Sequence, residues 1–568
     1  MMMKMTGAQA VLACLKKEGV PVVFGYPGGT VLTLYDELYK AEFPHILTGH
    51  EQGAIHAADG YARATGKTGV CFATSGPGVC NMVTGIATAN MDSVPLVIIS
   101  GQVTTSLIGR DSFQEADISG ITTPITKHNY LIKDVEELPH ILKEAFYIAS
   151  TGRPGPVLID IAKDVFDATL NFKYPKTVHL RGYSGRYIGQ EDHVTQAVEA
   201  LAAAHKPLLL AGGGVILSNT SGYLRSFVEK TQIPVITTLM GKGAVPDSYA
   251  NHLGMVGMHG SYAANMAVME CDLLLAIGSR FDDRVTGDAE NFAPNARIVH
   301  FDIDKVEINK IVHADISVGG DLRWSLPLLT NQVQQGRTPY KKQYQEWRNH
   351  VLAMKKDHPF ACRHLENQIS PEVLIKKLNQ RLDDDTIVVT DVGQHQMWAA
   401  QFYDTEKPRH FITSGGLGTM GYGLPAAMGA KLACPGQTVL LLSGDGSIMM
   451  NCQEFATLAD NGIAVKTVVL CNSVLGMVNQ WQRMFYHRRY AASLLKKGNR
   501  IPAISEAMGV PGFTATTPDT LDEAIEKFLS VPGPALLEVR IPADENVYPM
   551  VPGGKRLNEM ILEGGSRT

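Results

Sequence analysis

The sequence predicts an α/β protein built of three doubly wound parallel-sheet domains. Along its 568 residues, a short apolar strand, a glycine-rich turn and an amphipathic helix recur in three separable blocks. This order is typical of parallel sheets covered by helices. The length corresponds to about three or four domains of ordinary size, and 45% of the residues are hydrophobic.

The first block, residues 1–170, opens on apolar residues at helical spacing, from Ala8 to Leu15. A helical stretch is expected over 54–64. Strands are expected at 22–24, 45–48, 70–74, 96–100 and 157–162.

The second block, 190–345, is followed by a charged helical linker, 341–356, and then by the third block, 365–545. A C-terminal arm, 546–568, completes the chain. A strand followed by Gly-Pro-Gly at 70–78 and a strand followed by Gly-Asp-Gly at 439–446 suggest two related outer halves around an inserted middle. Strands are expected at 208–210, 235–239, 273–277, 298–302, 387–390, 439–442 and 465–470.

Composition argues against several classes of protein. The chain carries 51 basic and 56 acidic residues, a formal net charge of −5, so it offers no broad basic field for nucleic acid. The N-terminal apolar stretch Val11–Leu15 is interrupted at once by Lys16, and no apolar run has membrane-spanning length. Eight scattered cysteines form no CxxC pair. We therefore expect a cytoplasmic protein with reduced thiols and without a membrane or nucleic-acid partner.

A metal and diphosphate anchor is predicted at the ends of two strands. Gly444-Asp445-Gly446-Ser447 follows the strand 439–442, and Asn472 comes 27 positions after Asp445. A helix over 449–461 and a return strand fit between them, which places both side chains at carboxyl ends of parallel strands, where ligands of such sheets bind. One carboxylate and one amide oxygen suit Mg²⁺. The glycines and the following helix N-terminus favour a diphosphate. Without the distal asparagine, the motif would be an ordinary strand-to-helix turn.

The spacing of this motif is similar to the thiamine diphosphate (ThDP) motif of the pyruvate decarboxylase and acetohydroxyacid synthase superfamily. That resemblance implies a glutamate facing the aminopyrimidine of the cofactor from another domain. Glu51, after the strand 45–48, is the candidate, with the task of sharing a proton with the pyrimidine ring. The alternative is a surface glutamate in the first turn of a helix.

A motif in the middle block indicates which member of this superfamily the chain resembles most. Arg280-Phe281-Asp282-Asp283-Arg284-Val285-Thr286-Gly287 closely resembles acetohydroxyacid synthase, in which this domain holds FAD. The usual GxGxxG fingerprint is missing, so the residues alone indicate only an unspecified nucleotide site, or a solvated loop of ion pairs. The resemblance implies FAD contacts at Gly213, Gly214, Met258, His259, Gly260, Arg280, Asp302 and Asp304.

Further matches, including 24–29, 113–117, 152–157 and 415–421, extend the resemblance over nearly the whole chain. They imply that the Gly418 carbonyl receives the 4′-amino group of ThDP, that Met420 supports the bent cofactor, and that Gln394 and His395 hold diphosphate oxygens. Asp445 and Asn472 are the expected metal ligands. The expected ThDP contacts are Glu51, Gln394, His395, Gly418, Met420, Gly444, Asp445, Gly446, Ser447 and Asn472.

The same resemblance implies a pocket that excludes water while two 2-oxoacids meet. Arg280 is placed to pair with a carboxylate, and Trp481 is linked to the choice of acceptor. By spacing alone, Met477 and Trp481 would be a core pair on one helix. The expected pocket residues are Phe113, Met258, Arg280, Met477 and Trp481. Gly29, Gln114 and Lys163 match further catalytic positions, Lys163 supplying positive potential.

Four residues depart from the family pattern: Cys471, Cys80, Ala162 and Thr104, where the family usually carries Asn, Thr, Pro and Pro. None is a proposed catalytic group, although a thiol at position 471 is a weak hydrogen-bond partner beside Asn472.

The resemblance implies an acetohydroxyacid synthase of branched-chain amino-acid biosynthesis, with ThDP, Mg²⁺ and a structural FAD. It implies a homodimer or tetramer with each site shared between two subunits, and allows a small regulatory subunit. The alternative functions are those of a pyruvate oxidase-like flavoenzyme, a catabolic acetolactate synthase without FAD, and a cofactor-binding scaffold that has lost catalysis.

Overall fold

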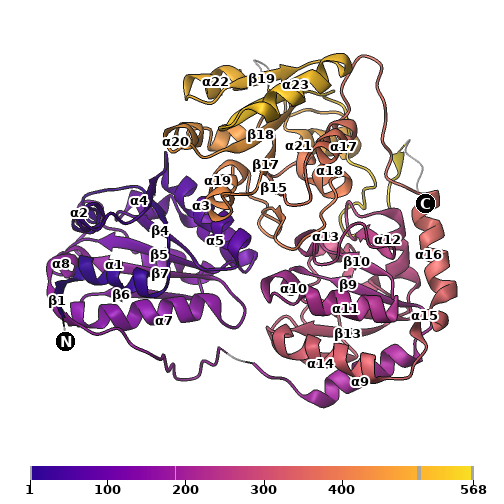
Figure 1. Ribbon diagram of the computed structural model, residues 1–568, viewed down its shortest axis with the longest axis horizontal. Coiled ribbons are helices and arrows are strands. Elements are labelled where there is room, and N and C mark those ends of the chain that lie inside the picture. The colour runs from indigo at the N-terminus through magenta and orange to yellow at the C-terminus, as the bar shows by residue number, and fades with distance from the viewer. Residues whose placement is uncertain (1–2, 186, 496–499, 564–568) are drawn as a thin grey trace.

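The computed structural model describes residues 3–185, 187–495 and 500–563, which form three α/β domains. Each domain has a six-stranded sheet in which all strands are parallel. Figure 1 shows the N-terminal domain at the left in indigo and purple, the central domain at the lower right, and the C-terminal domain above them in orange and yellow. The predicted fold class is confirmed.

The N-terminal sheet has the order β3-β2-β4-β5-β7-β6. Its inner strands are buried along their whole length, as expected for a parallel sheet with helices on both faces. The strands are β2 (Val23–Gly25), β3 (His45–Leu47), β4 (Gly69–Ala73), β5 (Leu96–Gln102), β6 (His128–Ile132) and β7 (Pro156–Ala162). The main helices are α1 (Gly7–Lys17), α2 (Leu32–Lys40), α3 (Glu51–Thr65), α5 (Val83–Met91), α7 (Leu138–Ser150) and α8 (Lys163–Asp167). Outside the sheet, β1 (Met3–Thr6) and β8 (Thr169–Phe172) form an antiparallel pair.

The central sheet has the order β11-β10-β9-β12-β13-β14. α16 (Gln345–Asp357) covers the segment predicted as a linker, but it packs against α12 (Tyr262–Glu270) with Trp347 and Val351 in the core, so the central unit extends to Asp357. The strands are β9 (Pro207–Ala211), β10 (Val235–Thr237), β11 (His252–Met255), β12 (Leu273–Ile277), β13 (Arg297–Asp302) and β14 (Ile316–Gly319). The other main helices are α9 (Glu191–Ala203), α10 (Gly213–Leu217), α11 (Ser221–Thr231), α13 (Asp283–Thr286), α14 (Leu322–Gln335) and α15 (Tyr340–Gln343).

The C-terminal sheet has the order β16-β15-β17-β18-β20-β19. The strands are β15 (Ile387–Thr390), β16 (Phe411–Ile412), β17 (Val439–Gly444), β18 (Val465–Cys471), β19 (Gly512–Ala515) and β20 (Ala535–Arg540). The helices are α17 (Pro371–Arg381), α18 (Gln394–Phe402), α19 (Gly423–Ala433), α20 (Glu454–Asp460), α21 (Gly476–Phe485), α22 (Ile501–Ala507) and α23 (Pro518–Ser530).

The helix predicted over 449–461 is wrong at its start. A short 3-10 turn, Ile448–Met450, follows the Gly-Asp-Gly segment, and α20 begins only at Glu454. Glu454 is fully buried and accepts a hydrogen bond from the backbone N–H of Gly49 at 3.1 Å, across the boundary between two domains. The chain therefore turns toward the N-terminal domain before the α-helix starts, and the start of α20 is not where a diphosphate anchored at Asp445 would meet a helix end.

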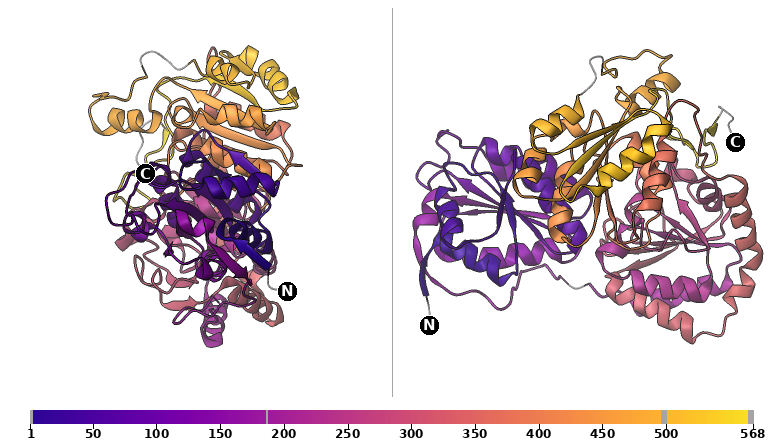
Figure 2. Two further views of the ribbon diagram at one scale, coloured as in Figure 1. Left: turned by 90° about the vertical axis from the view of Figure 1, so that its left-hand side faces the viewer. Right: turned by 45° about the horizontal axis from the view of Figure 1, so that its top comes forward.

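The two outer domains meet where α3 crosses α19. A Cβ atom built on Gly60 would lie 2.0 Å from the carbonyl oxygen of Ala426, and one built on Gly429 would lie 1.8 Å from that of Ala57. Each helix thus presents a glycine to a carbonyl group of the other, and only glycine permits so close an approach. Figure 2 shows from two further directions how the N-terminal and C-terminal domains adjoin here.

The segment after the last strand crosses back to the central domain. Val547 exchanges hydrogen bonds with the side chain of Gln480 on α21, and the N–H of Val551 donates to the carbonyl of Met258 at 2.8 Å. The expected C-terminal arm therefore links α21 to the central domain over its described residues, while 564–568 lie outside them. Among the described helices, none has both the length and the apolar character needed to cross a bilayer.

Candidate active site

The predicted metal ligands lie at the ends of neighbouring strands. β17 and β18 are parallel and paired up to Gly444 and Leu470, so Asp445 and Asn472 emerge together at the carboxyl edge of the sheet. The N–H of Ser473 donates to Asp445 Oδ2 at 2.7 Å, which holds the carboxylate against the turn that carries Asn472. Burial raises the pKa of Asp445. A buried carboxylate beside an amide oxygen is a donor set that suits Mg²⁺, whose charge would compensate the carboxylate.

Cys471, one of the departures from the family pattern, is part of this anchor. Its Sγ donates to Asp445 Oδ2 at 3.3 Å and accepts from Arg540 Nη1 at the same distance. The thiol therefore keeps the carboxylate in contact with β18, with a weaker bond than an amide would give.

Gln394 and His395 begin α18 beside this edge. The side chains differ in how far their hydrogen-bonding groups are already paired with other residues. The amide of Gln394 donates to Gln480 Oε1 and to the carbonyl of Glu545, both at 2.8 Å. His395 is buried, and its Nε2 has no hydrogen-bond partner among the described residues. Burial lowers the pKa of His395 to about 3, so the ring is neutral. A Cβ atom on Gly444 would lie 2.9 Å from His395 Nδ1, which shows how closely the ring approaches the start of the Gly-Asp-Gly turn.

The loop between β16 and α19 carries Gly418 and Met420. The carboxylate of Asp391 accepts hydrogen bonds from the N–H groups of Gly421 at 2.9 Å and Gly423 at 3.2 Å, and so shapes the end of this loop. Burial raises the pKa of Asp391 to about 6. Met420 is half-buried on the side of Gly446, where a Cβ atom would lie 3.9 Å from Met420 Cε. Gly446 and Ser447 complete the predicted turn, and Ser447 Oγ donates to the carbonyl of Val392.

Glu51 is the first residue of α3, with His50 as the N-cap. Its side chain is 8% exposed, so it is not the surface glutamate of the alternative interpretation. Asn81 Nδ2 donates to Glu51 Oε2 at 3.0 Å and fixes the orientation of the carboxylate. Asn81, next to Cys80, was not found by sequence reasoning, because nothing in its local pattern indicates a partner 30 positions away.

Other predicted residues lie along the same edge of the N-terminal sheet. Phe113 is 88% exposed, and Lys163 and Gly29 are exposed as well. Gln114 has a φ of 60°, and its carbonyl lies close to Gly76, just after β4. The single chain brings Glu51 and these residues to one edge, where Glu51 is buried but Phe113, Lys163 and Gly29 are not enclosed.

A buried network joins this domain to the loop that carries Gly418. Asp92 accepts from the N–H groups of Gly415 at 3.1 Å and Gly416 at 2.7 Å, while Arg63 Nη2 donates to it at 2.8 Å. Arg63 also pairs with the fully buried Asp59 at 2.6 Å. Sequence reasoning missed the contacts of Asp92 with the loop, since their partners are more than 320 positions away.

The predicted FAD residues collect at the carboxyl edge of the central sheet. Gly213 and Gly214 begin α10 after β9, and Gly214 packs against Gly278 at the end of β12. Burial raises the pKa of Asp302, the last residue of β13, to about 7. Asp304 pairs with Arg153 of the N-terminal domain at 3.2 Å.

The turn after β11 carries Met258, His259 and Gly260. His259 is buried, contacts the carbonyl of Pro549 through Nδ1 at 3.1 Å, and has no partner for Nε2 among the described residues. Burial lowers the pKa of His259 to about 4. A neutral, unpartnered imidazole nitrogen beside these strand ends fits a nucleotide ligand.

The predicted pocket residues come from all three domains, Phe113 being the one from the N-terminal domain. Met258 and Trp481 both contact Arg284: its Nη1 lies 3.5 Å from Met258 Sδ, and its guanidinium lies 5.9 Å from the centre of the Trp481 ring. Met477 packs against the core of the C-terminal domain. Arg280 lies near Gly416, where a Cβ atom would be 3.3 Å from its Nη2. Arg284 itself, expected only in a solvated loop, is half-exposed and joins the two pocket side chains.

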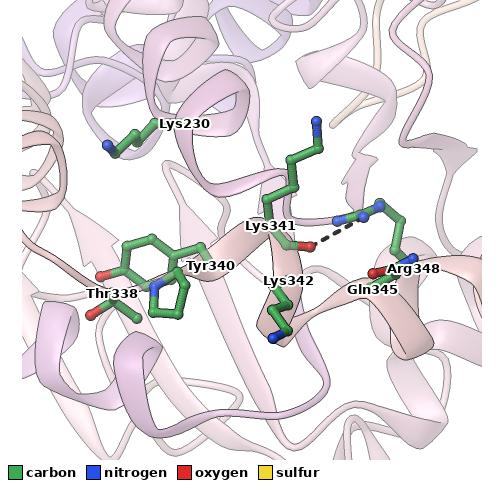
Figure 3. Close-up of a pocket in the computed structure, with 8 residues that line it drawn as sticks. Lys230, Thr338, Tyr340, Lys341, Lys342, Gln345 and Arg348 are labelled. Carbon is green, nitrogen blue, oxygen red and sulfur yellow. Dashed lines mark hydrogen bonds between the residues drawn. The ribbon is translucent and has the colours of Figure 1, made fainter.

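A hollow of about 500 Å³ lies apart from these strand ends, on the outside of the central domain. Figure 3 shows its lining from the end of α11 and from α15 and α16, where Arg348 donates to the carbonyl of Lys341 at 3.2 Å. None of the predicted site residues lines this hollow.

Comparison with known proteins assigns the chain to a family. The chain matches the models of the thiamine pyrophosphate enzyme N-terminal TPP binding domain over 5–121, the central domain over 194–329 and the C-terminal TPP binding domain over 391–539. It is 46% identical to an acetolactate synthase large subunit of Mycobacterium tuberculosis, covering 99% of this chain and 92% of the relative. It is 46% identical to the acetolactate synthase isozyme 2 large subunit of Escherichia coli, covering 98% and 99%. With the large subunit of Lactococcus lactis it shares 45% identity, covering 98% and 96%. The chain therefore belongs to the acetolactate synthase large-subunit family of thiamine diphosphate enzymes.

Proposed function

We propose that this chain decarboxylates pyruvate and joins the remaining two-carbon unit to pyruvate or 2-oxobutyrate, giving 2-acetolactate or 2-aceto-2-hydroxybutyrate for branched-chain amino-acid biosynthesis. The observation that carries the proposal is the position of Asp445, buried and bonded to the turn of Asn472 at neighbouring strand ends. Asp445 and Asn472 would hold Mg²⁺, and His395 Nε2 would meet a diphosphate oxygen. When bound, ThDP supplies the carbon nucleophile and the electron sink.

The residues of the chain orient the cofactor and manage one proton. Glu51, held by Asn81, would exchange a proton with the pyrimidine ring, and the Gly418 carbonyl would accept from its amino group. Met258, Trp481 and Arg284 would form the wall of the acceptor pocket, while Arg280 would pair with a carboxylate. We infer FAD at the carboxyl edge of the central sheet, with no redox turnover in this reaction.

We infer that a second copy of the chain completes the site. Phe113 is 88% exposed in the single chain, although a pocket that excludes water requires it to be covered. A homodimer in which the Glu51 edge of one copy faces the Asp445 edge of the other would cover it, and a tetramer is compatible with this. A small regulatory subunit is a further proposal, supported by the words "large subunit" in the names of relatives. Cytoplasmic localisation stays a prediction.

Product analysis tests the proposal. The full chain is incubated with ThDP, Mg²⁺, FAD and equal amounts of pyruvate and 2-oxobutyrate, and both acetohydroxyacids are expected. Formation of acetaldehyde or acetyl phosphate alone would contradict the proposal. Bleaching of the flavin by pyruvate at the rate of turnover would favour a pyruvate oxidase-like enzyme, and full activity without FAD would favour a catabolic acetolactate synthase.

A further inference from the structure

The loop of residues 103–117, between β5 and α6 (Ile118–Thr122), carries two of the predicted site residues, Phe113 and Gln114. We name it the Phe113 loop. All of its residues are described, and none of them belongs to a helix or a strand. Phe113 is 88% exposed in the single chain. Exposed loops of this kind are ordinarily mobile, but the backbone of this one is held at its start, in its middle and at its end.

The carboxylate of Glu115 holds the middle of the Phe113 loop. Its Oε2 accepts hydrogen bonds from the N–H groups of Ser112 at 2.9 Å and Arg110 at 3.3 Å, and its Oε1 accepts from that of Gly109. The hydrogen bonds from Gly109 and Ser112 contribute most to a lowered pKa of Glu115, whose carboxylate is therefore charged. Charged acceptors make the stronger hydrogen bonds. Glu115 thus closes the turn 109–112 onto the part of the loop that carries the aromatic side chain.

The start of the loop is held by α8, the helix that begins at Lys163. Asp164 accepts from the N–H of Thr105 at 2.9 Å and from its hydroxyl at 2.6 Å, using both carboxylate oxygens. Burial acts to raise the pKa of Asp164, but the hydrogen bonds from Thr105 outweigh burial and the pKa is lowered. Since Asp164 adjoins Lys163 in the chain, the loop and the backbone of this lysine keep one relative position.

The end of the loop is held by the buried Asp160 through Gln102. The amide nitrogen of Gln102 donates to the carbonyl of Ala116 at 3.0 Å and to Asp160 Oδ2 at 2.9 Å. Two residues before Ala116, the backbone of Gln114 packs on the turn after β4. A Cβ atom built on Gly76 in that turn would lie 2.6 Å from the Gln114 carbonyl oxygen. The second half of the loop therefore rests on the body of the domain.

The turn after β4 also lies next to Glu51. A Cβ atom built on Gly78 would lie 3.2 Å from Glu51 Oε1. One turn thus contacts both the carboxylate of Glu51 and the backbone beside Phe113. An aromatic side chain is therefore presented to the outside, on a fixed backbone, close to the residue that we propose to act on the pyrimidine ring. A group that is ordered before binding loses less entropy when the site closes.

We propose that Glu115 is a positioning residue, which fixes Phe113 and Gln114 before the substrate binds and so helps to keep water from the reacting two-carbon unit. The inference rests on the proposed function, because it takes these two residues to belong to the pocket. When the loop is loosened, more of the two-carbon unit left after the loss of CO₂ takes up a proton and leaves as acetaldehyde. Pyruvate and a proton then give acetaldehyde and CO₂, and no carbon–carbon bond forms with a second 2-oxoacid.

Product partition in Glu115→Ala tests the proposal. The full chain with ThDP, Mg²⁺ and FAD is supplied with pyruvate, and acetaldehyde and 2-acetolactate are measured. Their ratio should rise by at least about fivefold, since small displacements of positioned groups have large effects on rates. A variant that was merely less folded would form less of both products at an unchanged ratio. Glu115→Gln, which keeps one acceptor oxygen, should give a smaller rise.

The control is Glu136→Ala, at an exposed position of the same domain, and it should leave the ratio unchanged. An unchanged ratio in Glu115→Ala would refute the positioning role. Formation of acetaldehyde alone by the unaltered chain would instead contradict the proposed function.

Hydrogen exchange gives a readout that does not depend on catalysis. In Glu115→Ala, the amide groups of residues 109–112 should exchange at least about tenfold faster than in the unaltered chain, because they lose their acceptor. Peptides from α7 report in the same experiment whether the domain stays folded. Thr105→Val, which removes one hydrogen bond to Asp164, should change both readouts in the same direction and is the test if Glu115→Ala does not fold. Equal exchange at 109–112 in the variant and the unaltered chain would overturn the inference.

Discussion

The guanidinium of Arg284 lies over the ring of Trp481, 5.9 Å from its centre, and joins α21 of the C-terminal domain to the central domain. Cation–π contact of this kind contributes about 0.5–1 kcal/mol at exposed sites. The same side chain contacts Met258, so one arginine holds both walls of the proposed acceptor pocket.

Replacement of Arg284 by Ala should therefore change the choice of acceptor. With its support removed, Trp481 gives less contact to the additional methyl group of 2-oxobutyrate, and such contact is worth about 1–3 kcal/mol. We expect the ratio of 2-aceto-2-hydroxybutyrate to 2-acetolactate, measured with equal acceptors, to fall by up to about tenfold. Trp481→Leu should lower it further. Arg284→Lys, which keeps the charge, is the control. An unchanged ratio in Arg284→Ala, with a lower ratio in Trp481→Leu, would show that Trp481 acts on acceptor choice without support from Arg284.

Removing the carboxylate of Asp92 should destabilise the contact between the outer domains. Asp92→Ala leaves the buried Arg63 without one partner and frees the N–H groups of Gly415 and Gly416. Breaking a buried pair in this way costs about 3–5 kcal/mol. The thermal unfolding midpoint should fall by several degrees, whereas Asp36→Ala, at an exposed ion pair, should leave it nearly unchanged. Equal midpoints in the two variants would show that the network carries no stability.

The anchor at Asp445 should make ThDP binding dependent on a divalent ion. Asp445→Ala removes the only carboxylate of the proposed metal site, so we expect the affinity for ThDP measured with Mg²⁺ to drop by at least about 100-fold. Chelation of Mg²⁺ should reproduce this loss in the unaltered chain. Asp460→Ala, at the exposed end of α20, is the control. Tight binding of ThDP by Asp445→Ala would remove Asp445 from the metal site.

Glu51→Gln should leave ThDP bound but slow the exchange of hydrogen for deuterium at its thiazolium C2. The amide keeps the size of the side chain and a contact to Asn81, yet it does not exchange a proton with the ring. Glu506→Gln on the exposed surface of α22 is the control. An exchange rate equal to that of the control would exclude the proposed role of Glu51.

Asp391 should impose a pH dependence on stability. Its pKa is raised by burial from 3.8 to about 6 in the folded chain, so between about pH 4 and pH 6 the unfolded chain loses the proton first. The folded state then binds more protons than the unfolded state, so the free energy of unfolding falls as the pH rises through this window. The total decrease is about 3 kcal/mol. Asp391→Asn lacks this titration. The free energy of unfolding of the unaltered chain minus that of Asp391→Asn should be larger at pH 4.5 than at pH 6.5. An identical difference at both values would contradict the assignment.

The sequence predicted the three sheets, and the position of Asp445 and Asn472 at strand ends, because their signals are local. Buried parallel strands such as 439–442 are continuous apolar runs, and Asp445 and Asn472 each follow one directly. The start of α20 was misplaced because the turn before it is set by contacts with another domain. The edge strands β6, β11, β14, β16 and β19 were missed because edge strands are short and carry weaker patterns. The buried interior strand β20 was missed as well.

The supporting residues of the site were beyond sequence reasoning for a different reason. Asn81, Asp92 and Arg284 act through partners that only the packing of domains brings near. Arg284 belongs to a charged stretch whose ordinary interpretation is a solvated loop, and its contact with Trp481 depends on the placement of α21 against the central domain. Local patterns therefore indicate the residues that we propose to meet the cofactor, and tertiary contacts supply the residues packed around them.

The crossing of α3 and α19 limits how the outer domains can move against each other. With Gly60 seated on one carbonyl group and Gly429 on another, a shift of either helix along its axis would drive a neighbouring side chain into the opposing backbone. The hydrogen bonds of Asp92 with Gly415 and Gly416, and of Glu454 with Gly49, join the same two domains at other points. The two halves are therefore tied together by backbone contact at the helix crossing and by buried carboxylates on either side of it.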